Sequence, residues 1–466
     1  MAGLIAVEPG AGAAPAAQPA PAEPMPRAPR SVAETGVSPV YLDELALKTI
    51  HNAGPSTLDE LMRRMGLSLP VVQEVKERLT RRGLIEAAGI PGYAGPDYST
   101  FGYRFSLSER GEQRVAAALQ RSRYVGLAPV PIEQYADLAR VQSLRACPAT
   151  ADQIYDALSP FVLQSIVRRA LARAFHAGRP ALIYGDTGNG KTSIVDAYAR
   201  SFGQAVWIPA ALYAHGHTIR VYDSAVHHQI EPEAAPADEA PAANGRRPID
   251  LLRAESGPPD RRWLRVRRPV VSVGGELVAQ HLELAYDAEG GYYQAPPHVQ
   301  AQDGILIIDD FGRQRLRPED LLDRWIVPLE RGYDLLSLDA GERLLVPFET
   351  CVLFSTNLSP TDLADEALLR RIPYKVNIPN PNGQEIAEIT RRECDRRGLT
   401  VSPAAIDSLV KALFRPGQPT PKGVFPRDLL SIIEDGARFD GAAPELTPEA
   451  IEDACQVYFV SEDVRR

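Results

Sequence analysis

A glycine-rich stretch directly after a short apolar run constrains this chain more than any other feature. Residues 185–192 read Gly-Asp-Thr-Gly-Asn-Gly-Lys-Thr, which fits the pattern G-x-x-x-x-G-K-S/T, and an apolar run at 181–184 precedes them. The glycines let the backbone curl around phosphates with its N–H groups pointing inward, and the N-terminus of a following helix adds positive potential. The sequence therefore predicts a phosphate-binding loop between a buried strand and a helix.

Two residues of this loop have distinct predicted roles. The ammonium group of Lys191, one of only six lysines in the chain, would neutralise the β- and γ-phosphates of a nucleotide. The hydroxyl group of Thr192 would hold Mg²⁺. The residues expected to contact the nucleotide are Gly185, Asp186, Thr187, Gly188, Asn189, Gly190, Lys191 and Thr192.

A second apolar run ends in two carboxylates. Residues 304–310 read Gly-Ile-Leu-Ile-Ile-Asp-Asp. A carboxylate at the carboxyl end of a buried strand beside a phosphate loop can hold Mg²⁺, and we expect Asp309 to do so. Asp310 would then orient the attacking water. The plainer interpretation is that the two aspartates only begin a turn after the strand.

Three later features complete an ordered series. An apolar run at 350–356 ends at Asn357, residues 364–371 read Ala-Asp-Glu-Ala-Leu-Leu-Arg-Arg, and residues 423–430 read Gly-Val-Phe-Pro-Arg-Asp-Leu-Leu. The phosphate loop, the two aspartates and these three features follow one another in the order expected of AAA+ ATPases. Residues 150–466 therefore resemble that family.

Within the family, the chain resembles the MoxR-like group most. Residues 290–296 read Gly-Gly-Tyr-Tyr-Gln-Ala-Pro before the Asp-Asp run, residues 321–331 follow that run, and a hairpin-like passage at 335–346 leads into the next apolar run. The family usually has Glu where this chain has Asp310, whose side chain is one methylene shorter. This departure concerns the rate of hydrolysis and not nucleotide binding.

The resemblance implies roles for the remaining candidate residues. Asn357 would be sensor 1, the polar residue that reports the γ-phosphate. Arg370 and Arg371 would form the arginine finger that reaches the nucleotide of the adjacent subunit, and Arg427 would be sensor 2 at the start of a lid helix. Each also has a plainer interpretation: Asn357 as a helix cap, the arginine pair as a solvated helix end, and Arg427 as a partner in a surface salt bridge.

Composition and periodicity divide the N-terminal part of the chain into three segments. Residues 1–36 are rich in Ala and Pro and are expected to be a disordered leader. Residues 37–125 show three helical patterns, two strand-like runs and a fourth helical pattern, the order of a winged helix-turn-helix. Residues 126–150 contain three prolines and are expected to be a linker.

The rest of the chain is expected to form the ATPase core and its lid. A single helix over 152–177 would precede alternating strands and helices in the core, residues 151–380, with an acidic insertion near 231–260. Only helical patterns follow in residues 381–466, the predicted lid. The predicted fold class is α/β, a P-loop NTPase parallel sheet with a C-terminal helical lid, preceded by a winged helix-turn-helix.

The partner of the N-terminal module is left open by its charges. The predicted recognition helix, residues 68–82, carries arginines that could meet DNA, but Glu74 and Glu77 share its polar surface. Residues 38–125 hold 12 Lys/Arg and 10 Asp/Glu, a balance of only +2. Both DNA contact and docking of a protein are consistent with this balance.

Composition sets broader limits. With 44% hydrophobic and 24% charged residues, the chain belongs to the soluble globular class, and its net charge of −9 gives no bulk attraction to nucleic acid. No apolar run approaches the roughly 18 residues of a membrane helix, and no secretory signal is evident, so we expect a cytoplasmic protein without membrane insertion. The scattered cysteines predict neither disulfides nor a zinc cluster: Cys147, Cys351, Cys394 and Cys455.

The expected function follows from the resemblance. It implies an AAA+ ATPase that binds ATP with Mg²⁺, assembles with copies of itself, for example as a hexameric ring, and uses hydrolysis to remodel a protein client. The main alternative is a DNA-binding regulator that uses the winged helix and is switched by ATP. A small-molecule kinase is disfavoured by Asn357, the arginine pair and Arg427.

Overall fold

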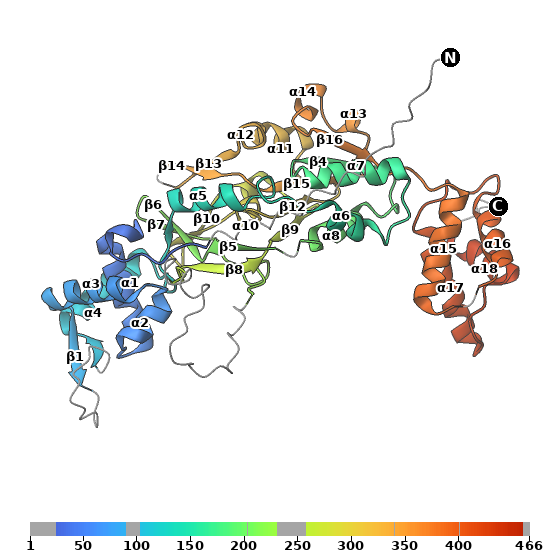
Figure 1. The fold of residues 1–466 in the computed structure, drawn as a ribbon. Helices are drawn as coiled ribbons and strands as arrows, with labels where there is room; N and C mark the ends of the chain where they lie inside the picture. Colours follow the sequence, from blue (N-terminus) through green and yellow to red (C-terminus); the bar gives the residue numbers. More distant parts are fainter. Residues whose placement is uncertain are drawn as a thin grey trace, which may run out of the picture.

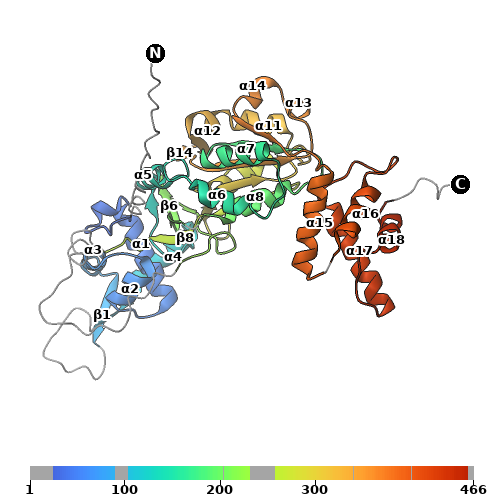
Figure 2. The same ribbon diagram turned by 45° about the vertical axis from the view of Figure 1, so that its right-hand side comes forward.

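The computed structural model describes residues 25–89, 103–202, 204–230, 258–339, 341–399 and 401–459. An N-terminal helical module and a C-terminal helical bundle lie at opposite ends of a central α/β part (Figure 1), and a second view shows the same arrangement (Figure 2). None of the helices in these ranges combines the length and the apolar character needed to cross a bilayer.

The central part is built on a sheet of five parallel strands. Because its strands are covered on both faces, they read as continuous apolar runs, and Ile305–Ile308 is buried at every position. The α/β class predicted for the core is thereby confirmed, with a parallel sheet covered by helices on both faces. In spatial order the strands are β16 (Tyr374–Asn377), β4 (Ala181–Tyr184), β15 (Cys351–Thr356), β12 (Ile305–Ile308) and β9 (Val270–Val273).

Alternate residues of these strands enter two apolar cores. Ile183 packs with α6 (Ala151–Leu158), α7 (Ser165–His176) and α8 (Lys191–Arg200), whereas its neighbour Leu182 faces the other side. The second side is covered by four short helices: α11 (Pro318–Arg324), α12 (Ile326–Arg331), α13 (Pro360–Leu363) and α14 (Glu366–Leu369).

The single helix expected over 152–177 is wrong. The chain forms two helices there, α6 and α7, separated by Ser159–Gln164. Pro160 explains the break, because proline lacks a backbone N–H and disfavours the helical conformation of the residue before it.

A second, mixed sheet lies between the N-terminal module and the parallel sheet, and two antiparallel strand pairs accompany it. The pair β13–β14 is the predicted hairpin-like passage, and it is paired from Tyr333 with Pro347 to Ser337 with Arg343. The mixed sheet has the order β10 (Ala285–Asp287), β11 (Tyr292–Gln294), β7 (His217–Arg220), β6 (Ala211–Ala214) and β3 (Val130–Pro131), and the pairs are β5 (Ala205–Pro209) with β8 (Trp263–Arg267) and β13 (Tyr333–Ser337) with β14 (Arg343–Pro347).

Residues 126–150 are not the linker that we expected. They supply β3 to the mixed sheet and form the helix α5 (Ile132–Gln142), in which Tyr135 is 1% exposed. The apolar positions Ile132, Tyr135 and Ala139 recur at helical spacing, and this periodicity outweighs the prolines around them.

The N-terminal module contains helices and one strand pair in the order predicted for a winged helix-turn-helix. The apolar side chains of α3, Val71, Val72, Val75 and Leu79, are buried as expected. The residues between the two strands, 90–102, lie outside the described ranges, and the winged-helix assignment stays a prediction. The elements are α1 (Pro39–Ala53), α2 (Leu58–Met65), α3 (Leu69–Arg81), the antiparallel pair β1 (Ile85–Gly89) with β2 (Tyr103–Leu107), and α4 (Glu109–Arg121).

The last part of the predicted leader is folded. Residues 1–24 lie outside the described ranges, but Val32 is 2% exposed and packs in the core of the N-terminal module. The backbone N–H of Val32 donates to the Glu74 carboxylate of α3 at 2.9 Å. The predicted end of the disordered leader, residue 36, is therefore too late. Val32 is an apolar core residue within a segment whose composition is dominated by alanine and proline.

The predicted lid is a bundle of four helices with an apolar core of its own, which includes Leu409, Leu429 and Ile451. It follows β16 through residues 378–382. Most of the predicted insertion, residues 231–257, lies outside the described ranges. The helices of the bundle are α15 (Gly383–Arg397), α16 (Pro403–Leu413), α17 (Phe425–Asp440) and α18 (Pro448–Tyr458).

Candidate nucleotide-binding site

The predicted phosphate loop lies between β4 and α8, as its sequence indicates. Gly188 and Gly190 have φ of 84° and 78°, in the left-handed region that favours glycine, so the backbone turns sharply before the helix. Gly185 is required for space, because a Cβ atom there would lie 2.2 Å from the carbonyl oxygen of Ile378. The glycines thus place a tight loop at the N-terminus of α8, an arrangement suited to anions.

Lys191 lies inside this loop. Its Nζ donates to the carbonyl oxygens of Gly185 and Asp186, each at 2.9 Å. Burial lowers the pKa of Lys191 from its ordinary value, and the nearby Lys422 lowers it further, while the carboxylates around it act in the opposite direction. An anion in the loop would favour the charged form of this lysine.

Thr192 and Asp309 meet across the sheet edge. The Thr192 hydroxyl lies 3.1 Å from each carboxylate oxygen of Asp309, although 117 residues separate them in sequence. A hydroxyl and a carboxylate are the hard oxygen ligands that Mg²⁺ accepts beside substrate phosphates. The two residues predicted as metal ligands are therefore brought together, and their donor set fits Mg²⁺.

Asp310 occupies an unusual backbone position. Its φ is 49°, in the left-handed region, and its side chain is exposed. Non-glycine residues held in this region occur preferentially at functional sites, because the surrounding structure must stabilise them. Here the next residue is fixed on both sides: Phe311 N–H donates to Ser355 at 2.7 Å, and Phe311 C=O accepts from the Thr356 hydroxyl at 2.6 Å.

Strand order places Asn357 between the loop and the aspartates. β15 lies between β4 and β12, and Thr356, the residue before Asn357, is the register partner of Tyr184. The Asn357 Oδ1 is buried without a hydrogen-bond partner among the described residues. A buried polar atom without a partner calls for an explanation, and a ligand or water at the sheet edge would provide one.

The lid contacts the phosphate loop directly. Lys422 Nζ donates to the Thr187 hydroxyl at 3.2 Å, and the backbone N–H of Gly423 donates to Asn189 Oδ1 at 3.0 Å. Val424 packs against the loop, since a Cβ on Gly188 would lie 2.8 Å from its Cγ1. The segment before α17 therefore rests on the tip of the loop.

A second connection lies where the chain enters the lid. The Asn380 side chain accepts from Asn189 Nδ2 at 2.7 Å and donates to Asp186 Oδ2 at 2.6 Å. This amide braces two residues of the loop from the segment that joins β16 to α15.

A narrow crevice of about 40 Å³ adjoins these contacts. It has space for only a few waters. Its walls come from the residues before α7 and its first turn, the segment after β16, the first half of α15, Gly423 and the loop itself. The apolar residues that line it are Val162, Leu163, Val167, Ile378, Pro379, Pro381 and Ile389.

Arg427, the predicted sensor 2, is not brought to the loop. Its guanidinium donates to the Asp428 carboxylate at 3.0 and 2.9 Å, and 59% of its side chain is exposed. This is the surface salt bridge that the sequence left open as an alternative. Lys422, five residues earlier, contacts the loop instead.

Arg370 and Arg371 lie at the amino ends of the parallel strands, opposite the carboxyl ends where the phosphate loop lies. They precede β16, whereas the phosphate loop follows the neighbouring strand β4, whose four residues span about 13 Å. Neither arginine is therefore close to the chain's own phosphate loop. Arg371 pairs with Glu330 at 3.0 Å.

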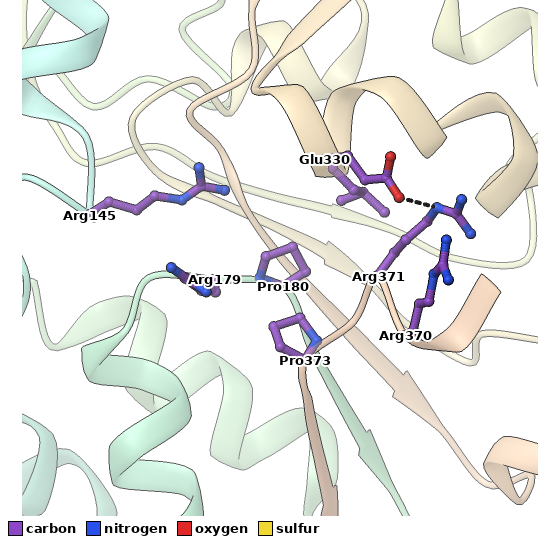
Figure 3. A pocket seen from close by; sticks show the side chains of 8 residues that line it. Arg145, Arg179, Pro180, Glu330, Arg370, Arg371 and Pro373 are labelled. Carbon is purple, nitrogen blue, oxygen red and sulfur yellow. Dashed lines mark ion pairs between the residues drawn. The ribbon is translucent and has the colours of Figure 1, made fainter. Parts of the chain in front are cut away.

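The arginine pair lines an open pocket of about 500 Å³ (Figure 3). Arg145 and Arg179 line the same pocket from two other segments. Among the described residues, Arg145, Arg179 and Arg370 have no ion-pair partner within 4 Å, and Glu330 is the carboxylate in the lining of the pocket. The pocket has a net positive charge and is suited to an anion.

Several of these residues escaped the sequence reasoning. Asn380 and Lys422 reach the loop from 194 and 235 residues away in sequence, and no local motif marks them. The scarcity of lysine in the chain was the one available signal for Lys422. No feature of the sequence marked Arg145 or Arg179 as part of a pocket.

Comparisons with other proteins give one sequence match and several distant structural ones. Residues 384–457, which span most of the lid, match a protein family described as a domain of unknown function, DUF8689. The sequence matches none of the curated proteins.

Several solved structures are similar to this chain at low sequence identity. They include NtrX from Brucella abortus (14% identity, TM-score 0.35), which covers 76% of this chain. The chain spans 62% of that protein's length. Also similar are NtrX from Brucella abortus in complex with ADP (15% identity, TM-score 0.37, covering 76% of this chain and 69% of that one) and a RuvB P216G mutant from Thermotoga maritima (13% identity, TM-score 0.37, covering 64% and 72%).

Proposed function

We propose that this chain is an AAA+ ATPase that binds ATP with Mg²⁺ and hydrolyses it. The observation that carries the proposal is the contact of Thr192 with Asp309 beside a lysine-bearing phosphate loop. Both side chains offer oxygen ligands, and together they would hold Mg²⁺ beside the bound phosphates. Mg²⁺ would neutralise charge on the phosphates.

Different residues of the chain bind the phosphates, hold the base and act on the attacking water. Backbone N–H groups of the loop and Lys191 hold the phosphates, and the apolar crevice beside the loop takes the base once the lid and the segment before α7 part. Asp310, exposed at the sheet edge, orients the attacking water and accepts its proton. Asn357 holds the water or the terminal phosphate between the loop and Asp310.

The binding step is tested with Lys191→Ala. We expect loss of measurable ATP binding by calorimetry, because the ammonium group inside the loop is removed. Lys411→Ala, a change in the lid helix α16, is the matched control and should bind normally. Undiminished affinity in the Lys191 variant would refute the phosphate-loop assignment.

The chemical step is tested with the two aspartates. Asp310→Asn should bind ATP with Mg²⁺ and hydrolyse it at least roughly a hundredfold more slowly, the contribution of a positioned acid–base group. Asp309→Asn should weaken Mg²⁺-dependent binding instead. Single-turnover hydrolysis and nucleotide titration on both variants separate the two roles, and normal turnover in Asp310→Asn would move the water-orienting role elsewhere.

We further propose that copies of the chain assemble into a ring in which the arginine pocket of one subunit meets the nucleotide of the next. The support is the position of Arg370 and Arg371, which are far from their own phosphate loop and share a cationic pocket with two other arginines. A trans role explains both facts.

Mixing experiments test this assembly. A double variant, Arg370→Ala with Arg371→Ala, should be inactive alone, as should Lys191→Ala, and mixed rings should recover part of the activity. Co-assembly is checked by light scattering. Folded proteins that co-assemble without any recovery would overturn the trans role.

For the client of the ATPase, a protein is favoured over DNA. Two arginines of the predicted recognition helix already have a partner within the module, since Arg78 and Arg82 pair with the buried Asp43 at 2.7 and 3.4 Å. The leader also contacts this helix at Ser68 and Glu74. A client protein that accelerates ATP hydrolysis would support remodelling, whereas a sequence-specific and strongly salt-dependent DNA footprint would support the regulator.

A further inference from the structure

The lid contains a lysine whose surroundings are not those of a surface lysine. Lys422 is one of six lysines in the chain, and its ammonium group rests on the Thr187 hydroxyl at the tip of the phosphate loop. Among the described residues it has no carboxylate partner. A cation held beside a phosphate loop without a counter-charge is placed for an anion.

The two residues that follow Lys422 are also fixed to the loop. Gly423 N–H bonds to Asn189 Oδ1 at 3.0 Å, and Val424 packs against Gly188. The position of Lys422 therefore depends on the conformation of the loop, and any ligand that alters the loop also acts on the segment that begins α17.

Two positive groups share this small space. Lys191 donates to the carbonyl oxygens of Gly185 and Asp186, and Lys422 donates to Thr187 of the same loop, so the two ammonium groups repel each other. A polyphosphate between them would replace this repulsion by two attractions. By contrast, Arg427 is already paired with Asp428 on the surface.

We propose that Lys422 is a second phosphate ligand, supplied by the lid, and that the segment matching the domain of unknown function closes on the phosphates of a nucleoside triphosphate through this lysine. The inference rests on the proposed function. It assigns to Lys422 the phosphate contact expected of Arg427. It also gives the lid a defined role, because the charge in the loop sets how firmly the lid is held.

The test compares charge at two positions five residues apart. Lys422→Gln keeps a long polar side chain but removes the charge, Lys422→Arg keeps the charge, and Arg427→Gln is the matched control. In calorimetry with Mg²⁺ and ATP, we expect Lys422→Gln to bind ATP about tenfold more weakly than the unaltered chain, or weaker still. This is the effect of losing one charge-assisted hydrogen bond. Lys422→Arg should recover most of the affinity, and Arg427→Gln should match the unaltered chain.

A second readout follows the lid itself. Hydrogen exchange should show that ATP protects the first turns of α17 in the unaltered chain and in Arg427→Gln, but not in Lys422→Gln. A merely structural role of Lys422 would alter exchange without nucleotide and leave the response to ATP intact.

The outcomes separate this inference from the proposed function. Suppose that Lys191→Ala loses ATP binding, while Lys422→Gln binds ATP normally and its α17 amides are protected by ATP as in the unaltered chain. Then only the role of Lys422 is overturned. Weakened binding in Arg427→Gln with normal binding in Lys422→Gln would return the role to the arginine. Normal binding in Lys191→Ala would refute the nucleotide site as a whole.

Discussion

The N-terminal module and the lid are attached to the central part in opposite ways. The module shares an apolar core with the mixed sheet: Ala211 is fully buried in the module's core, and Tyr213 and Tyr292 pack against it. The lid has a core of its own that includes no described residue of the central part, and its contacts with the central part include those of Arg392 with the carbonyl of Ser159 and of Gly423 with Asn189.

One buried arginine strengthens the first attachment. Arg262 is 1% exposed, forms a bidentate pair with Asp260, and donates to the carbonyl oxygens of Thr35 at 3.0 Å and Pro129 at 3.4 Å. It thus joins the end of the leader, the start of β3 and the strand β8 that follows it. No comparable buried ion pair joins the lid to the central part among the described residues.

The difference has a functional consequence. Apolar burial and a desolvated ion pair do not respond to a small ligand, so the module moves with the mixed sheet as one body. The contacts of the lid lie on the residues that a nucleotide would bind, so phosphates compete with them or reinforce them. Under the proposed function, the lid is the part that would respond to ATP, and the module is the part that would carry the response to a partner.

The largest effect is expected from Arg262→Ala. It leaves the Asp260 carboxylate buried without its partner, and we expect a loss of about 3 to 5 kcal/mol in the free energy of unfolding. Urea unfolding measures this loss. Arg261→Ala, at the exposed neighbouring residue, should change stability by less than about 0.5 kcal/mol. Equal stability of the two variants would show that the module is not held through this pair.

Hydrogen exchange compares the two attachments directly. Without nucleotide, the amides of α17 should exchange roughly tenfold or more faster than those of α1, because the lid can open locally while the module opens only with its shared core. Equal protection in the two helices would mean that the lid is held as firmly as the module.

A smaller effect is expected at the seam of the module, the contact between Tyr41 of α1 and the mixed sheet. The Tyr41 hydroxyl bonds to Thr218 of β7, and its ring contacts Tyr213 at a centroid distance of 5.2 Å. Tyr41→Phe keeps the ring contact and should cost about 1 kcal/mol in unfolding free energy, with ATP affinity unchanged. The same substitution at the exposed Tyr155 is the control. A loss of ATP affinity in Tyr41→Phe would contradict a seam insulated from the site.

The smallest effect on stability is expected from Asn380→Ala. The residue is near the surface, so the free energy of unfolding should change by no more than about 0.5 kcal/mol. ATP affinity should still fall by a few-fold, because the loop loses its brace between Asp186 and Asn189. Calorimetry and thermal unfolding on one sample separate the two quantities, and unchanged affinity would show that the brace is dispensable.

The sequence predicted features that depend on a local pattern, but not the contacts between distant segments that attach the lid. The parallel sheet, Lys191 with its loop and the pair of Thr192 and Asp309 were predictable, because each depends on a local pattern next to a buried strand. Lys422 was not predictable, because its contact with Thr187 exists only once the lid has folded back over 235 residues of chain.

The ends of the N-terminal module were misjudged for a related reason. Alanine and proline around Val32 and Tyr135 suggested a leader and a linker, but burial against distant segments decides their structure. The contacts that fix them come from Glu74 in one case and from the mixed sheet and hairpin in the other. Composition describes a segment by itself and does not include such partners.

The reach of Arg262 also bears on how the chain folds during synthesis. The carbonyl of Thr35 and the guanidinium that binds it are 227 residues apart. At roughly 5 to 20 residues per second, a ribosome needs about 10 to 45 seconds between these two points. For that time the carbonyl of Thr35 lacks its buried partner, so the attachment of the module to the central part is completed only after residues 260–262 have been synthesised.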